Sequence, residues 1–245
     1  MRTIGRYLRA APLALLCASL ASCTRDDRAR MHCQHGAEFL SVGKFEEAVT
    51  SFRQALRLGL DTADLHHSMG WAYIGCNRPQ AAAESFMDAI RLSPDYPEAH
   101  YGLGLSLFKL GRYAEAEKAY SRAIGLNPGY ADAYVGIAAC YENMKQHDNA
   151  MRACGEAIRL NPVLPGAYVC LGWLYRNEGR IPDALEALKK AVEFAPGDAD
   201  SRFRLGEIYC ILNDTNAALA EYSILKTMDK AKAKELFDLI YPQGR

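Results

Sequence analysis

The sequence predicts an all-α solenoid made of six helix–turn–helix units. A glycine or alanine recurs every 34 residues with no insertion or deletion, at Gly36, Gly70, Gly104, Ala138, Gly172 and Gly206. An alanine follows twelve residues after each of them, and a proline closes four of the units, at Pro94, Pro128, Pro162 and Pro196. A period of this length is typical of stacked helix pairs, in which each pair buries its apolar side against its neighbours.

The units begin at residues 29, 63, 97, 131, 165 and 199, and positions are counted below from the first residue of each unit. Small residues at positions 8 and 20 let the first helix of a unit lie close to the second. The prolines at position 32 end the second helix. Position 15 lies in the turn between the two helices. Glycine or asparagine, which suit a left-handed turn residue, occupies it in five units, and Lys145 is the exception.

These residues closely resemble the tetratricopeptide repeat. Unit five fits the pattern best, with Leu171, Gly172, Tyr175, Gly179, Ala184, Ala191 and Pro196. The tryptophan usual at position 4 is absent, and this position holds His32, His66, His100, Tyr134, Tyr168 and Arg202. The resemblance covers about residues 29–232, as repeats 29–62, 63–96, 97–130, 131–164, 165–198 and 199–232. It implies a right-handed superhelix whose concave groove is lined by the first helix of each repeat.

Residues 229–241 predict a further helix that overlaps the end of repeat six. Leu236, Leu239 and Ile240 share one face of this helix, and lysines occupy the other. We expect the helix to cap the apolar end of the array. A helix lying on a membrane surface is the alternative.

The first 22 residues predict a signal peptide. A basic start is followed by an apolar stretch from Ala10 to Ala21 that is too short to span a bilayer. Its end, Leu20-Ala21-Ser22-Cys23, resembles the bacterial lipobox, which implies cleavage before Cys23 and acylation of that residue. Residues 23–28 are then a lipidated cysteine and a short tether, and Thr24 favours the outer membrane, facing the periplasm. An ordinary secretory signal cut near Ala21 is the alternative.

Composition narrows the function. The chain has 29 basic and 29 acidic residues, and removal of residues 1–22 takes three arginines, which leaves 26 − 29 = −3. No basic stripe is present, so a nucleic-acid partner is not expected. No phosphate-binding loop, nucleophile elbow or His-Glu-x-x-His motif occurs, so neither enzyme activity nor a cofactor is expected. The repeats are expected to form one continuous domain.

Six further cysteines leave their pairing open. They are Cys33, Cys76, Cys140, Cys154, Cys170 and Cys210. An oxidising envelope permits disulfides, and Cys140, Cys154 and Cys170 fall close enough in the repeats to pair. Burial as small apolar residues is the other interpretation. The histidines His32 and His35, spaced i, i+3, suit packing better than a metal site.

The resemblance places positions 5, 9 and 12 of each first helix in the groove. There we expect a partner-binding surface made of His67, Trp71, Ile74, Tyr101, Leu105, Phe108, Val135, Val169, Trp173, Arg176 and Phe203. Trp71, Tyr101, Leu105 and Phe108 fall in two adjacent repeats and suggest a common apolar patch. Packing between neighbouring helices is the alternative for some of them.

The sequence therefore favours a non-enzymatic, membrane-anchored adaptor that binds a peptide or helix of an envelope protein. A secretin pilotin for type IV pilus or secretion assembly is one alternative, since some pilotins are lipoproteins with six such repeats. An adaptor for cell-wall hydrolases or proteases is another. A metal- or thiol-dependent envelope protein is the third.

Overall fold

Thirteen α-helices and no strand occupy residues 24–242, the part of the chain that the computed structural model describes. The predicted signal peptide and Cys23 lie outside these residues. None of the described helices has the length and apolar character needed to cross a bilayer. The helices are α2 (Arg25–Ser41), α3 (Phe45–Arg57), α4 (Ala63–Gly75), α5 (Pro79–Leu92), α6 (Pro97–Lys109), α7 (Tyr113–Leu126), α8 (Ala131–Asn143), α9 (His147–Leu160), α10 (Pro165–Asn177), α11 (Ile181–Phe194), α12 (Ala199–Ile211), α13 (Thr215–Met228) and α14 (Lys230–Ile240).

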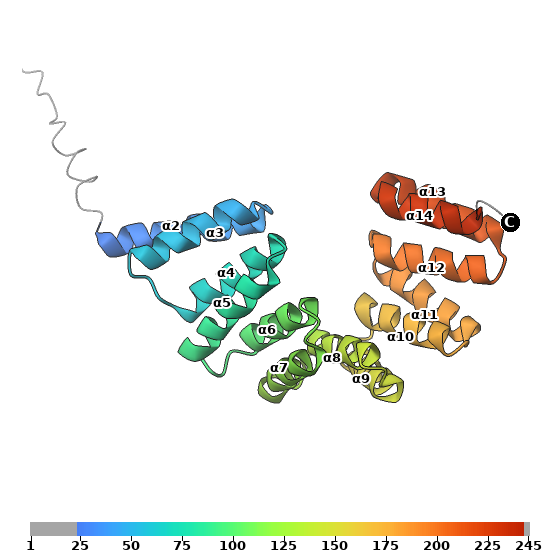
Figure 1. The fold of residues 1–245 in the computed structure, drawn as a ribbon, viewed down its shortest axis with the longest axis horizontal. Coiled ribbons are helices and arrows are strands. Elements are labelled where there is room, and N and C mark those ends of the chain that lie inside the picture. Colours follow the sequence, from blue (N-terminus) through green and yellow to red (C-terminus); the bar gives the residue numbers. More distant parts are fainter. Residues whose placement is uncertain (1–23, 243–245) are drawn as a thin grey trace, which may run out of the picture. The chain divides into compact units, whose positions relative to one another are not determined.

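Successive helices pack as pairs, so the predicted all-α repeat architecture is confirmed (Figure 1). The contacts group the chain into two compact units, Met1–Leu92 and Ser93–Arg245, and not into the single continuous domain expected from the sequence. In a repeat array each helix pair touches only its neighbours, so the contacts divide readily into separate groups. Helices α2–α5 belong to the first unit and α6–α14 to the second.

The turn between paired helices has the same backbone conformation in every repeat. The residue at position 15 has a positive φ in all six: Gly43, Asn77, Gly111, Lys145, Gly179 and Asn213. Lys145 adopts φ 62° although its side chain disfavours the left-handed region. The repeat architecture therefore imposes this turn even where the residue does not favour it.

Small residues at position 8 lie directly against a bulky residue of the second helix. A Cβ added to Gly104 would stand 2.7 Å from Tyr120 Cδ1, closer than carbon atoms approach in proteins. Repeat four reverses this size relation, because Ala138 stands where the others have glycine and the small Cys154 replaces the bulky residue. Both residues are fully buried. The larger Ala138 and the smaller Cys154 together keep the distance between α8 and α9 similar to that in the other repeats.

Repeat six is completed by α14. A Cβ added to Gly206 would lie 2.6 Å from Leu236 of α14, so Leu236 fills the place taken in other repeats by the second helix. Asp229 caps α14 by accepting hydrogen bonds from the backbone N–H groups of Ala231 and Lys232. Leu236 is fully buried, but Leu239 is 46% exposed and does not share its buried face, contrary to the sequence pattern. The reason is that Ala233, Leu236 and Ile240 form the inward side of α14, and Leu239 lies roughly 90° around the helix from the centre of that side.

The first helix begins earlier than the first repeat. Thr24 caps α2 through its hydroxyl, which accepts from the backbone N–H of Asp27, and the Asp27 carboxylate accepts in return from the N–H of Thr24. This reciprocal cap starts the helix at Arg25. Residues 25–28, which were expected to form a tether, are therefore the first turn of α2.

Candidate partner-binding surface

A network centred on Trp173 connects three first helices of the second unit. Trp173 on α10 donates its Nε1–H to Glu142 Oε1 of α8, at 2.6 Å. The guanidinium carbon of Arg176 lies 4.9 Å from the centre of the Trp173 ring, and that of Arg204 on α12 lies 5.1 Å from it. Both distances are within the range of a cation–π contact. The indole is thus held by charged groups from α8, α10 and α12.

A carboxylate extends this network on α12. The Arg176 guanidinium and the Glu207 carboxylate lie 3.7 Å apart. Burial raises the pKa of Glu207 and outweighs the opposing attraction of Arg176 and Arg204. The surface therefore contains both signs of charge around one aromatic ring, and its side chains are half-buried.

The apolar residues beside this network differ in how far they enter the core. Val169 is half-buried on the same helix as Trp173. Phe203 packs against the cluster that contains Leu225 and Leu236, so part of its ring belongs to the core of repeat six. Val135 lies against the start of α10, where a Cβ on Gly166 would stand 3.5 Å from it.

The α6 end of the expected groove is largely structural. Tyr101 stacks on Tyr130, with ring centres 5.0 Å apart, and lies 5.5 Å from Tyr120. Burial raises the pKa of Tyr101. Phe108 packs 5.3 Å from Tyr113. Leu105 is half-buried on the same helix. Packing between helices, the alternative open at the sequence level, thus describes Tyr101 and Phe108.

The first unit has its own aromatic group on α4. Trp71 Nε1–H donates to His67 Nε2 at 3.0 Å, one turn earlier on the same helix. The Trp71 ring meets Phe86 of α5 edge-on at 5.7 Å, and Ile74 is half-buried nearby on α4. The residues of the apolar patch that the sequence predicts in repeats two and three therefore belong to two compact units.

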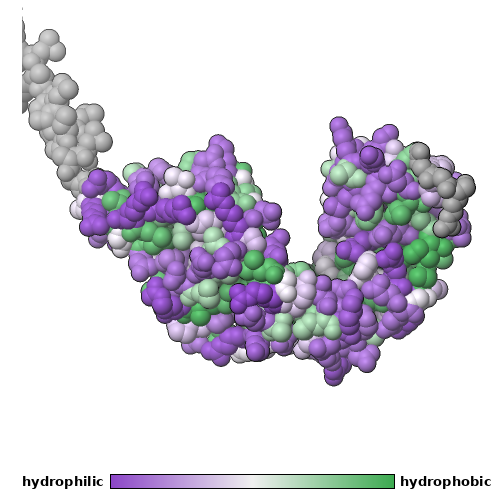
Figure 2. Space-filling model, viewed as in Figure 1, coloured by the Kyte–Doolittle hydropathy of each residue, from purple (hydrophilic) through white to green (hydrophobic). Residues whose placement is uncertain are grey.

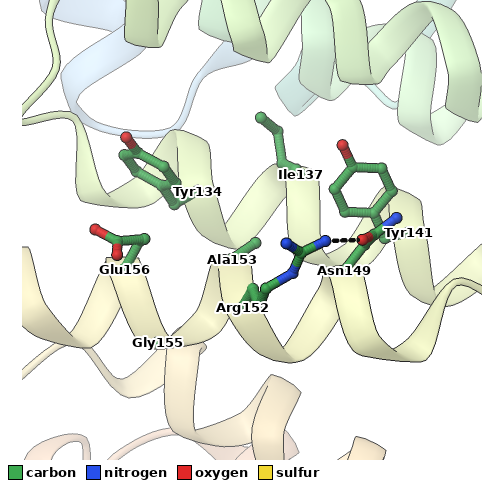
Figure 3. A pocket seen from close by; sticks show the side chains of 8 residues that line it. All are labelled: Tyr134, Ile137, Tyr141, Asn149, Arg152, Ala153, Gly155 and Glu156. Atoms are coloured by element: carbon green, nitrogen blue, oxygen red, sulfur yellow. Dashed lines mark hydrogen bonds between the residues drawn. The ribbon is translucent and has the colours of Figure 1, made fainter.

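A hollow of about 470 Å³ lies on another side of α8 (Figure 3). Tyr134, Ile137 and Tyr141 line it from α8, at a spacing that defines a different helix face from that of Glu142. Helix α9 supplies Arg152, which bonds to Asn149. Sequence reasoning missed this hollow. Its only signal was the small residues of α9, such as Gly155, which leave space there.

Position 4, where the family usually has tryptophan, ties repeats three, five and six to the turn before each of them. Tyr168 donates its hydroxyl to the carbonyl oxygen of Pro162 at 2.9 Å, and Arg202 Nε donates to that of Pro196 at 2.7 Å. His100 Nε2 bonds to the carbonyl of Pro94 in the same way. His35 of the candidate histidine pair is exposed. Within residues 24–242 no three metal-ligating side chains are grouped closely enough to hold an ion.

The cysteines of residues 24–242 are all free thiols. Cys140 and Cys154 are fully buried, and burial raises the pKa of Cys140 to about 12. A hydrogen bond with Cys170 and burial raise the pKa of Cys154. These thiols therefore stay protonated and pack as small apolar groups.

Comparison with known proteins decides the family. Residues 28–236 match the family model of the C-terminal domain of cilia and flagella-associated protein 70. The chain belongs to this family of tetratricopeptide repeats. No curated protein sequence matches it.

Solved tetratricopeptide repeat structures share the fold. PilF of Pseudomonas aeruginosa is 20% identical with a TM-score of 0.68, over 87% of this chain and 98% of PilF. PilW, described as a widely conserved type IV pilus biogenesis factor, is 20% identical with a TM-score of 0.72, over 85% of this chain and 98% of PilW. MamA is 30% identical with a TM-score of 0.57, over 65% of this chain and 93% of MamA.

Proposed function

We propose that this protein is a non-enzymatic, membrane-anchored scaffold of the bacterial cell envelope that binds a partner protein on the face formed by α8, α10 and α12. The observation that carries the proposal is the Trp173 network. It places a half-buried indole among charged side chains from three successive first helices. Tetratricopeptide repeat proteins are typically scaffolds for protein–protein interaction, which fits this role.

The chemistry of the face suits a partner segment that is apolar or amphipathic, such as a helix laid in the groove. Trp173 is held by its bond to Glu142, so little side-chain entropy is lost when a partner covers it. Tryptophan in a pre-ordered setting is a frequent hot spot of binding. The lysine and asparagine by which chaperone-binding members of the family hold a terminal carboxylate are missing from positions 5 and 9, so a different ligand is expected.

Photocrosslinking in intact envelopes tests this proposal. Probes at Ala139 and Val169 flank Trp173 on the proposed face, and probes at the exposed Lys118 and Lys189 on second helices are the matched controls. We expect the first two probes to capture one common partner, and Trp173→Ala to remove the capture while the helical circular dichroism is kept. Equal capture from the control probes, or capture that survives Trp173→Ala, would contradict the proposal.

The anchor is part of the proposal. The Leu20-Ala21-Ser22-Cys23 sequence supports acylation of Cys23 and residence at the outer membrane, facing the periplasm. Replacement of Cys23 by serine is expected to abolish labelling by a radioactive fatty acid and to release the protein from the membrane fraction. Labelling that persists in the variant would exclude Cys23 as the acylated residue.

Type IV pilus assembly is the second candidate function. The lipobox, the six repeats and the fold shared with PilW, itself named as a pilus biogenesis factor, favour a secretin pilotin. Deletion of the gene is then expected to deplete heat-resistant secretin multimers. Normal multimers in the deletion strain would exclude this role and leave the scaffold proposal intact.

A further inference from the structure

Helices α13 and α14 carry a group of lysines and aromatic rings outside the Trp173 network. Lys226 and Tyr222 of α13, together with Lys230, Lys234 and Phe237 of α14, line a shallow hollow of about 290 Å³. We call these five residues the basic-aromatic face. Lys230, Lys234 and Phe237 follow an i, i+4, i+7 spacing, which places them on one side of α14.

The lysines of this face have no acidic partner within hydrogen-bonding distance among the described residues 24–242. Lys226, Lys230 and Lys234 are exposed, and in residues 24–242 none of the three forms an ion pair. The neighbouring Lys232 differs, because it lies 3.2 Å from Asp200 and 3.3 Å from Asp229. The Asp229 carboxylate thus binds Lys232 and the N-terminal backbone of α14, and not the three lysines of the face. The face therefore offers three cations to an anionic surface.

The rings of the face and the adjacent Tyr241 pack against one another at tilted angles, and Phe237 and Tyr241 are partly open to solvent. Phe237 lies 5.4 Å from Tyr222 and 5.0 Å from Tyr241, measured between ring centres. Phe237 is 36% exposed and Tyr241 is 47% exposed. The C-terminal end of α13 adds Met228, which is 36% exposed. Folding thus leaves apolar surface uncovered beside the three lysines.

We propose that the basic-aromatic face docks on an anionic lipid bilayer. Lysines attract anionic headgroups, their methylene stems lie along apolar surface, and aromatic rings favour the boundary between headgroups and acyl chains. Helix α14 has 11 residues, far fewer than the roughly 20 that span a bilayer, so it lies along the surface. Both walls of the hollow are helices, which offer no strand edge for an extended peptide.

The charge pattern of α14 supports this choice of face. Glu235 lies roughly 130° around the helix from the centre of the side that carries Lys230, Lys234 and Phe237, and Asp238 lies at the edge of that side, roughly 70° from its centre. In the view of Figure 2, hydrophilic and hydrophobic residues are mixed over the helices of the second unit. The lysines and the exposed ring of Phe237 thus gather on one side of α14.

Chemical labelling of lysines in the full chain tests the proposal. The protein is reconstituted in vesicles of phosphatidylglycerol or of phosphatidylcholine and treated with a membrane-impermeant amine reagent, and each lysine is quantified by mass spectrometry. We expect Lys226, Lys230 and Lys234 to react several-fold more slowly on phosphatidylglycerol vesicles. The exposed Lys109 and Lys189 of other helices serve as internal controls and should react equally on both.

Two variants separate the contributions of charge and rings. Phe237→Ser combined with Tyr241→Ser should reduce the protection although all three lysines remain, and Leu212→Ser, at an apolar residue 44% exposed elsewhere, should not. High salt should also remove the protection, because it screens the headgroup charge.

Equal rates at the three lysines on both kinds of vesicle would overturn the proposal. So would protection by soluble polyglutamate and not by either vesicle, which would assign the face to an acidic protein. A lipid anchor at Cys23 would hold the protein on both vesicle types alike. Failure of the anchor therefore appears as loss of vesicle association, and failure of this proposal as equal labelling.

Discussion

Trp71 and Trp173 occupy the same position of their repeats but make different contacts. Trp71 bonds to His67 on its own helix and packs against Phe86 of the paired helix. Trp173 bonds to Glu142 on the preceding first helix and lies beside an arginine from the following one. Position 9 places both indoles at the same point of the repeat, and the neighbouring side chains decide which groups each indole contacts.

Truncation of the two indoles should give the largest difference. We expect Trp173→Ala to lower the free energy of unfolding by about 3 kcal/mol, since a half-buried tryptophan is lost together with its charged partners. Hydrogen exchange should accelerate in α8 and α12 as well as α10. Trp71→Ala should accelerate exchange in α4 and α5, which carry His67 and Phe86. Unchanged exchange in α8 and α12 of Trp173→Ala would contradict the role of Trp173 as a link between three helices.

Removal of the indole N–H alone should give a smaller effect. Trp173→Phe keeps a ring but removes the indole N–H that donates to Glu142 Oε1, which should cost about 1.5 kcal/mol, the scale of a hydrogen bond to a charged group. Trp71→Phe loses a bond to a neutral histidine and should cost about half as much. Urea unfolding followed by circular dichroism measures both. A greater loss from Trp71→Phe would reverse the ranking.

The left-handed turn residues that follow α8 and α4, Lys145 and Asn77, should differ in their effect on stability when each is replaced by glycine. Lys145→Gly should stabilise the protein by about 1 kcal/mol, because glycine adopts φ 62° without steric cost. The backbone N–H of residue 145 donates to the carbonyl oxygen of Glu142, the residue that binds Trp173. The substitution should therefore also stabilise the C-terminal end of α8. Asn77→Gly is the matched variant and should change stability by only a few tenths of a kcal/mol, because asparagine tolerates this conformation. A loss of stability in Lys145→Gly would show that the left-handed backbone conformation of Lys145 is not strained.

The pH dependence of stability should show the smallest difference. Because burial raises the pKa of Glu207 above its ordinary value of 4.5, the folded protein keeps this proton where the unfolded chain has lost it. This contribution to stability is present at low pH and is lost as the pH rises from about 4.5 through the folded pKa. Glu207→Gln should flatten the slope of unfolding free energy in that window. Identical slopes in the parent protein and in Glu207→Gln would show that burial does not raise the pKa of Glu207.

The sequence predicted the scaffold better than the surface. The 34-residue spacing located every turn, including the left-handed turn at Lys145, because these features are repeated and local. The sequence assigned the aromatic residues of α6 to a groove, but their spacing does not reveal that Tyr101 stacks on Tyr130 and is partly buried by it. The link from Trp173 to Glu142 spans 31 residues and depends on the helix packing, so no local pattern indicates it.

Repeat four also constrains how such a gene can change. Ala138 and Cys154 fit each other, as Gly104 and Tyr120 do, but the two sets do not mix. A recombination event that joined the first helix of repeat four to the second helix of repeat three would place the alanine methyl against the tyrosine ring. We therefore expect a crossover within these two repeats to destabilise the protein more than a crossover that falls between repeats.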